Sequence, residues 1–171
     1  GKSYHIGQKI AATMTSMGIP AQMLHPSEAL HGDLGIVHEG DIALLLSYSG
    51  ESRELLELTP LLRDREVLLV TITGSSESSL AQQSHHVLPV PIPQEACPFN
   101  MAPTTSALVT LAAADALAML LCQARDFTVE EYARRHPSGA IGNGLFLSAQ
   151  DIMRTDDRLA ILPPGASIRA G

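Results

Sequence analysis

Three hydroxyl side chains surround a glycine in the segment 47–52, which has the sequence Ser-Tyr-Ser-Gly-Glu-Ser. A continuous apolar run at 42–47 precedes it and an amphipathic pattern at 52–63 follows it, so we expect a buried strand, this loop and then a helix. A helix N-terminus offers unpaired N–H groups and a partial positive charge, to which hydroxyls add neutral donors. The segment therefore favours a phosphate site. The alternative is that Ser49 or Ser52 only caps the helix.

A lysine near the start of the sequence admits two interpretations. Gly1-Lys2-Ser3 is similar to the end of a nucleotide-binding Walker A loop. The acidic strand that accompanies such a loop is missing, because neither 42–47 nor 67–73 ends in Asp, which argues against a nucleoside triphosphatase. Lys2 is then either a group beside the same ligand as the serines or a solvated surface lysine.

Metal sites and a serine nucleophile are not supported by the motifs. The 7 His residues contain no HExxH pair, and Cys97 and Cys122 form no CxxC motif. Ser49 lacks the flanking glycines of the Gly-x-Ser-x-Gly nucleophile elbow. We therefore expect no metal and no cofactor, and two free thiols of the kind kept in a reducing cytoplasm.

The elements that must position these groups alternate between strand and helix. Strands are predicted at 21–25, 42–47, 67–73 and 86–90, the last at a sheet edge because Pro89, Pro91 and Pro93 interrupt pairing. Helices are predicted at 4–17, 27–34, 52–63, 77–84, 104–125 and 129–135. This order predicts an α/β fold, in which a parallel sheet has helices on both faces and binds ligands past the carboxyl ends of its strands. The segments expected there are 1–3, 47–52, 73–76 and 95–105.

The helix predicted at 104–125 is apolar nearly all round, so we expect it to be buried in the domain or in an oligomer interface. Its most apolar run, 107–122, contains Asp115 and is shorter than the roughly 20 residues of a membrane span. Residues 1–20 also lack the pattern of a signal peptide. We expect no association with a membrane.

Bulk composition sets the remaining bounds. The chain has 171 residues, 45% of them hydrophobic and 17% charged, which is typical of one soluble globular domain. Its 11 Lys and Arg against 18 Asp and Glu leave a net charge of −7. An acidic chain argues against nucleic-acid binding. A single phosphate held by hydroxyls and N–H groups remains compatible with that charge.

Taken together, the motifs resemble those of the sugar isomerase (SIS) domain, and within it the bacterial D-arabinose 5-phosphate isomerases. The matching segments are 1–7 (GKSYHIG), 25–35 (HPSEALHGDLG), 47–52 (SYSGES), 95–98 (EACP), 102–106 (APTTS), 115–118 (DALA), 124–128 (ARDFT) and 136–142 (HPSGAIG). They stand in family order over residues 1 to about 153, which makes the resemblance specific.

The resemblance implies a three-layer αβα Rossmann-like fold and an aldose–ketose isomerase that interconverts D-ribulose 5-phosphate and D-arabinose 5-phosphate. The product would supply 3-deoxy-D-manno-octulosonate (Kdo) for lipopolysaccharide or capsule. It also implies a cytoplasmic homotetramer. The alternatives are an isomerase for another ketose phosphate and a non-catalytic sugar-phosphate sensor, which would have no need of the catalytic set below.

Site residues follow from the same resemblance. Those implied to bind the phosphate or the sugar are Ser3, Ser47, Ser49, Ser52, His31 and Thr104. The implied catalytic set is Lys2, Glu54, Glu95 and His136. Isomerisation through an enediolate needs a base, for which Glu95 is the first choice and Glu54 the second. Lys2 would stabilise the oxyanion, and His136 would move protons between oxygens.

Some features depart from the family. Ser138 stands where Gly is usual, and Asn143 where a basic residue is common. We expect residues 1–150 to form the SIS domain without its first strand, and 151–171 to resemble the entry to a CBS module but to be too short to build one.

Overall fold

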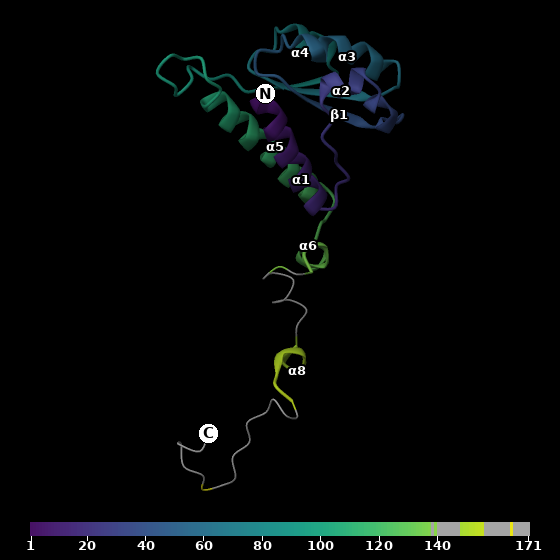
Figure 1. Cartoon of the computed structure of the whole chain (residues 1–171), viewed down its shortest axis with the longest axis vertical. Helices are drawn as coiled ribbons and strands as arrows, with labels where there is room; N and C mark the ends of the chain where they lie inside the picture. The colour runs from purple at the N-terminus through teal and green to yellow at the C-terminus, as the bar shows by residue number, and fades with distance from the viewer. Residues whose placement is uncertain (138, 140–147, 156–164, 166–171) are drawn as a thin grey trace. The chain divides into compact units, whose positions relative to one another are not determined.

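Three parallel strands form the centre of the fold (Figure 1). The computed structural model describes residues 1–137, 139, 148–155 and 165. The strands are β1 (Ile42–Leu46), β2 (Leu68–Thr73) and β3 (His86–Pro89), hydrogen-bonded in that order. Leu46 pairs with Ile72, and Ile72 pairs in turn with Leu88, so the carboxyl ends of the strands meet at one edge of the sheet. The chain divides into two units, Gly1–Phe127 and Thr128–Gly171, each described by itself.

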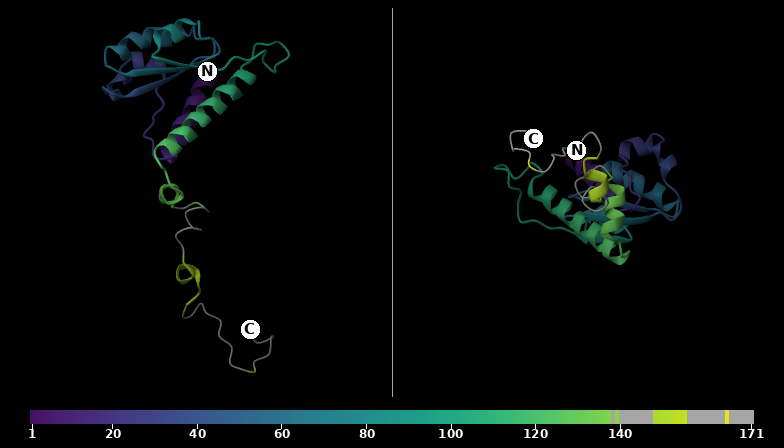
Figure 2. Two further views of the ribbon diagram at one scale, coloured as in Figure 1. Left: turned by 180° about the vertical axis from the view of Figure 1, so that it is seen from behind. Right: turned by 90° about the horizontal axis from the view of Figure 1, so that it is seen from below.

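Helices cover both faces of this sheet. On one face lie α2 (Pro26–Leu30), α3 (Arg53–Arg63) and α4 (Ser79–Gln83), and on the other α1 (Lys2–Ser16) and α5 (Thr105–Ala124). The first core contains Leu45, Leu58, Leu69 and Leu80. The second contains Ile10, Ile72 and Ala114. The views in Figure 2 show α1 and α5 side by side, away from α3. The predicted three-layer αβα fold is confirmed.

The strands differ in burial from what their apolar runs predict. β2 is the central strand, and Leu69 and Ile72 on its two faces are fully buried. β1 is equally apolar in sequence but forms an edge of this sheet, where Ile42 is 66% exposed. β3 is the other edge, as its prolines predict.

Two predicted elements between α1 and β1 are wrong in detail. The strand expected at 21–25 is absent, because no strand of the described residues lies beside this segment to share hydrogen bonds with it. The helix expected at 27–34, with a break at Gly32, ends at Leu30, and a 3-10 turn, η1 (Asp33–Ile36), follows, so the bounds differ but the predicted break is confirmed. Gly32 separates the two because its φ of 132° is incompatible with a continuous helix.

Within the single chain α5 is only partly buried, and the other alternative, burial in an oligomer interface, stays a prediction. Only one stripe of small and polar residues is buried, composed of Ser106, Thr110, Ala114 and Ala118. Leu108 is 69% exposed and Leu120 61% exposed. A salt bridge between Lys9 and Asp115 joins α5 to α1. With 20 residues, α5 is also long and apolar enough to cross a membrane by length and composition alone, a test that the core helix of a soluble protein passes as well, so the expectation of no membrane association stays a prediction.

The described residues of the second unit include two short helices. A capping box between Thr128 and Glu131 begins α6 (Val129–Arg135), which has the predicted bounds. The second helix is α8 (Ala149–Ile152). Asn143 and Ser138 lie outside the described residues. The predicted domain boundary after residue 150 stays a prediction.

Candidate active site

Two of the three serines in the loop between β1 and α3 contact each other directly. Ser47 is 3% exposed, and its Oγ accepts a 3.1 Å hydrogen bond from the Gly50 N–H and lies 2.8 Å from Ser52 Oγ. A hydroxyl has one donor and two acceptor positions. When Ser47 donates to Ser52, the Ser52 O–H is left to donate outward, toward a ligand.

The N-terminus of α3 is open. Ser52 is at the N-cap position, but its side chain makes no cap hydrogen bond. The N–H groups of Arg53 and Glu54, in the first turn, have no intrahelical partner. The exposed Ser49 accepts from the Glu51 N–H at 3.2 Å, so its own proton is available as well. Neither serine caps α3, and the arrangement is that of a phosphate site.

This loop, residues 47–52 (hereafter the phosphate loop), is fastened to the segment that begins α4. Gly50 has a φ of 67°, and a Cβ atom there would overlap the side chain of Ser78. The Gly50 carbonyl accepts from Leu80 N at 3.0 Å, and Glu51 Oε1 accepts from Ser79 N at 2.8 Å. That backbone hydrogen bond lowers the pKa of Glu51. Sequence reasoning singled out the glycine between the hydroxyls, Gly50, but missed the role of Glu51.

Tyr48 connects the ends of all three strands. Its carbonyl accepts from Thr73 Oγ1 at 3.2 Å, at the end of β2, and from Gly74 N at 2.8 Å, directly past it. Its hydroxyl accepts from Ile92 N at 3.2 Å, past β3. Sequence reasoning missed this role, and the position of Tyr48 between two serines gives no signal for it.

Glu95 closes the loop between β3 and α5. Its Oε2 accepts from Thr104 N at 2.9 Å, Thr104 Oγ1 at 3.0 Å and Ser106 N at 3.2 Å, and its Oε1 accepts from the Ser106 hydroxyl. The Ser106 hydroxyl contributes most to lowering the pKa of Glu95 to about 2, and the other donors assist. Glu95 is therefore an ionised carboxylate that caps the start of α5.

The remainder of that loop is also held by hydrogen bonds. The Thr104 hydroxyl accepts from Ala96 N at 2.9 Å as well as donating to Glu95, so its proton is used within the loop and one acceptor position remains. Asn100 Oδ1 accepts from Glu95 N at 2.7 Å. The Cys97 sulfur accepts from Met101 N and Ala102 N, each at 3.1 Å, and these N–H groups lower the pKa of the thiol.

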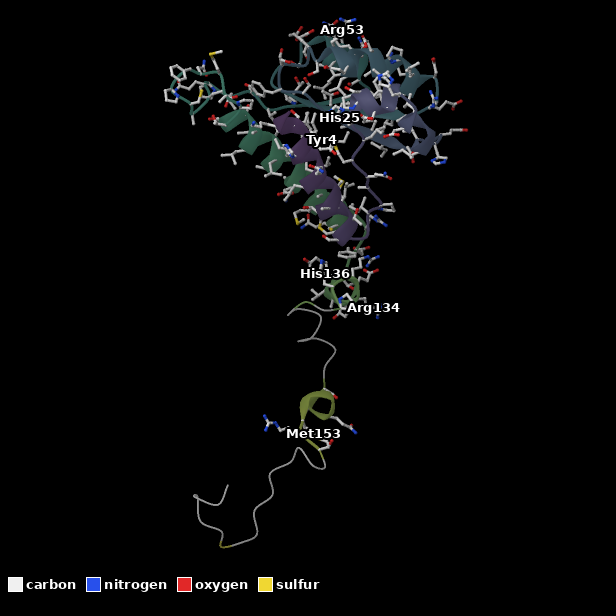
Figure 3. All side chains as sticks on the ribbon, in the orientation of Figure 1. Tyr4, His25, Arg53, Arg134, His136 and Met153 are labelled. Atoms are coloured by element: carbon white, nitrogen blue, oxygen red, sulfur yellow. The ribbon has the colours of Figure 1, made fainter. Side chains whose placement is uncertain are left out.

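Lys2 and Ser3 are exposed in the first turn of α1. A Cβ on Gly7 would lie 3.6 Å from Leu46, the last residue of β1, so this end of α1 approaches the carboxyl edge of the sheet. Figure 3 shows Tyr4 and His25 close together, and their rings are 5.2 Å apart. In the described part of the chain, no hydrogen bond joins Lys2 or Ser3 to another predicted site residue.

The other predicted groups do not contact one another. Glu54 is exposed in the first turn of α3, and in the described part of the chain its carboxylate has no hydrogen-bond or ion-pair partner. Its neighbour Arg53 pairs with Glu57 at 2.7 Å. His31 is exposed at the C-terminus of α2.

His136 belongs to the second unit and ends α6 (Figure 3). Its ring stacks on Tyr132 with centroids 4.1 Å apart, and its Nδ1 lies 2.8 Å from the Tyr132 carbonyl oxygen. A carbonyl only accepts, so Nδ1 carries a proton in this hydrogen bond. Its place beside the other groups stays a prediction.

No metal-ligand cluster is found within the described residues, where no group of three or more His, Cys, Asp or Glu side chains could hold an ion. Cys97 and Cys122 are free there, and Cys122 contacts the sulfur of Met17. The expectation of no metal and no cofactor stays a prediction.

A parallel αβα sheet with an open, hydroxyl-lined helix N-terminus at its carboxyl edge has the arrangement with which α/β domains can bind phosphate groups. The SIS domain model matches residues 1–120, and the chain belongs to the SIS domain family. It is 48% identical over 169 residues to the arabinose 5-phosphate isomerase KdsD of Yersinia pestis, an alignment that covers 99% of this chain and 52% of that protein. The chain thus spans about half the length of the curated relatives it matches.

Solved structures agree with this family. The Escherichia coli CFT073 protein c3406, in complex with arabinose 5-phosphate, is 39% identical with a TM-score of 0.77, and the match covers 80% of this chain and 73% of that one. A Bacteroides fragilis protein described as a phosphosugar isomerase involved in capsule formation is 44% identical with a TM-score of 0.78, covering 81% and 73% of the two chains.

Proposed function

We propose that the protein is an aldose–ketose isomerase that interconverts D-ribulose 5-phosphate and D-arabinose 5-phosphate. The observation that carries the proposal is the 48% identity to an arabinose 5-phosphate isomerase across nearly the whole chain. The phosphate loop supplies the matching chemistry, since Ser49, Ser52 and the start of α3 present donors to one anion. The product would enter Kdo synthesis for lipopolysaccharide or capsule.

The reaction moves one proton between C1 and C2 of the sugar. With the phosphate held by the phosphate loop, a base removes the proton from one carbon to give an enediolate, and the proton returns to the other carbon. A second proton moves between the two oxygens, so the atoms balance without a redox partner. Lys2 would stabilise the negative oxygen of the enediolate, and His136 would carry the proton between oxygens through its Nε2.

Glu54 is our choice of base, in place of Glu95. The hydroxyl and backbone donors that lower the pKa of Glu95 to about 2 weaken it as a proton acceptor. Glu54 is exposed in the first turn of α3, the helix that Ser52 begins, and among the described residues no hydrogen bond or ion pair occupies its carboxylate. Ser3, His31 and Thr104 stay proposed contacts to the sugar.

We also propose a cytoplasmic homotetramer that binds no nucleic acid, membrane or metal. The exposed apolar side chains of α5, Leu108 and Leu120 among them, would be covered by other copies of the chain. A detergent-free particle of four subunits in light scattering would support the homotetramer. Recovery only with the membrane fraction would contradict it and would favour α5 as a membrane helix.

The test of the activity is turnover of ribulose 5-phosphate by the purified protein, beside a panel of hexulose and heptulose phosphates. Arabinose 5-phosphate as the product is the expected result. Turnover of another ketose alone would identify a different isomerase. Binding of sugar phosphates with no turnover would favour the sensor.

The test of the base is solvent deuterium exchange at the sugar carbon. Glu54→Gln should slow exchange by about 10²-fold or more, because a general base contributes that much. Glu95→Gln should retain measurable exchange. The reverse pattern would identify Glu95 as the base.

A further inference from the structure

We propose that Ser106 is a positioning residue, whose hydroxyl and backbone N–H hold Glu95 as a fixed anionic acceptor for a sugar hydroxyl. Ser106 is in the first turn of α5 and only 2% exposed, so it cannot itself touch the substrate. It acts through Glu95, which stands eleven residues earlier in the chain. The inference rests on the proposed function, in which Glu95 belongs to the site.

The two oxygens of Glu95 are unequally used. Oε2 accepts three hydrogen bonds, two from Thr104 and one from the Ser106 N–H, whereas Oε1 accepts one, from the Ser106 hydroxyl. An ionised carboxylate has about four acceptor positions, two on each oxygen, so the three donors at Oε2 share its two positions. Oε1 therefore retains one acceptor position, and Glu95, although partly buried, remains open to solvent on one side.

Ser106 is the donor that decides this arrangement, because it binds both oxygens at once. Bonds to Oε1 and Oε2 from one residue prevent the carboxylate from rotating about its last torsion. A group held in this way binds a ligand without first losing rotational freedom. In the described residues, the titratable group beside Glu95 is the Cys97 thiol. The Met101 and Ala102 N–H groups lower the pKa of this thiol, and the charge of Glu95 raises it.

The kinetic test compares Ser106→Ala with the unchanged protein on ribulose 5-phosphate. Loss of a hydrogen bond to a charged group predicts that kcat/KM falls by about tenfold. The loss should be mainly in KM, and kcat/KM should acquire an acidic limb between about pH 4 and 5, where an unheld glutamate titrates. Ser106→Thr, which keeps the hydroxyl, should restore both.

The matched control is Thr110→Val, which removes another buried hydroxyl one turn further along α5. A purely structural role for Ser106 would give Ala and Val variants the same loss of thermal stability and no new acidic limb. That result would overturn the inference, as would an unchanged KM in Ser106→Ala.

A second measurement separates this inference from the proposed function. The carboxyl carbon of Glu95, followed by NMR, should titrate at a higher pH in Ser106→Ala than in the unchanged protein, with or without substrate. If the unchanged protein turns over no sugar phosphate, the proposed function fails, and this titration still decides whether Ser106 holds Glu95. Identical titration in the two proteins overturns the inference.

Discussion

The starts of α3 and α5 are two answers to the same physical problem. Each helix follows a loop at the carboxyl edge of the sheet, and each begins with N–H groups that have no intrahelical partner. At α5 the chain supplies its own anion, since Glu95 accepts from the N–H groups of Thr104 and Ser106. At α3 no side chain caps the helix. The molecule thus fills one helix N-terminus internally and leaves open the other, where we propose that the phosphate binds.

The open end is stabilised from outside rather than by a cap. The Ser52 hydroxyl oxygen lies next to that of Ser47 and does not accept the usual N-cap hydrogen bond from the backbone of α3. The neighbouring α4 segment compensates, because Leu80 N and Ser79 N bond to Gly50 and Glu51. An open helix N-terminus therefore needs a rigid loop before it.

The largest effect is expected where the phosphate loop has no room for a side chain. Gly50→Ala places a Cβ against Ser78 at a φ of 67°, so we expect the free energy of unfolding to fall by about 3 kcal/mol. Denaturant unfolding measures this. Gly35→Ala is the control, because nothing lies within 4 Å of its Cβ position, and it should change stability by less than about 0.5 kcal/mol. Equal stability of the two variants would refute a rigid phosphate loop.

The second-largest effect is expected from the hydrogen-bond donors at the open N-terminus of α3. Ser52→Ala removes the hydroxyl that can donate to the ligand when Ser47 donates to it. KM for the sugar phosphate should rise by about tenfold, as for a lost hydrogen bond to a charged group. Inhibition by inorganic phosphate should weaken in parallel. Ser76→Ala, an exposed serine of the neighbouring loop, is the control and should leave both constants unchanged. A KM change without a change in phosphate inhibition would argue against phosphate at this end.

The filled end should be sensitive to acid. The folded pKa of Glu95, about 2, lies below the ordinary value of 4.5, so ionised Glu95 stabilises the fold fully above about pH 4.5. This stabilisation is lost as pH falls through 4.5 toward 2. Glu95→Gln should lower stability at pH 7 and have less effect near pH 2, as measured by denaturant unfolding across that range. The exposed Glu39→Gln serves as the control. A constant difference between Glu95→Gln and the unchanged protein across this range would be incompatible with the proposed cap.

The smallest effect is expected at the link between the two ends. Tyr48→Phe removes only the hydroxyl that accepts from Ile92 N, and stability should fall by about 1 kcal/mol. The ring that lies against Gly74 is retained. Thermal unfolding measures the change, with Tyr132→Phe in the second unit as the control. Equal effects of the two changes would mean that the Tyr48 hydroxyl adds no stability.

Much of the fold follows from local patterns. The apolar runs at β1, β2 and β3 and the bounds of α6 agree with the predicted ranges to within one or two residues. The phosphate loop was predicted as a unit because its serines lie within six residues, on one strand–helix junction. The segment 21–25 was wrongly predicted as a strand because a strand depends on a neighbour that the segment itself does not reveal.

The site could be predicted as a set of residues but not as an arrangement. Glu95 and Glu54 have the same side chain, and only their surroundings distinguish an ionised cap from an exposed carboxylate. Ser106 was not predicted as a site residue, since it reaches Glu95 through a loop of irregular backbone. The signal in the sequence was that Ser106 stands close to Thr104, in the segment 102–106.

The sequence by itself determined the alternation of strands and helices, the hydroxyl-lined phosphate loop and the SIS resemblance, because each depends on residues close together in the chain. Tertiary structure alone decided that β1 is an edge strand, that α5 exposes Leu108 and Leu120, and that Glu95 fills the start of α5. The physical reason is that burial and hydrogen-bond partners are set by groups distant in sequence. The tertiary fold therefore decides which helix end is filled and which is open.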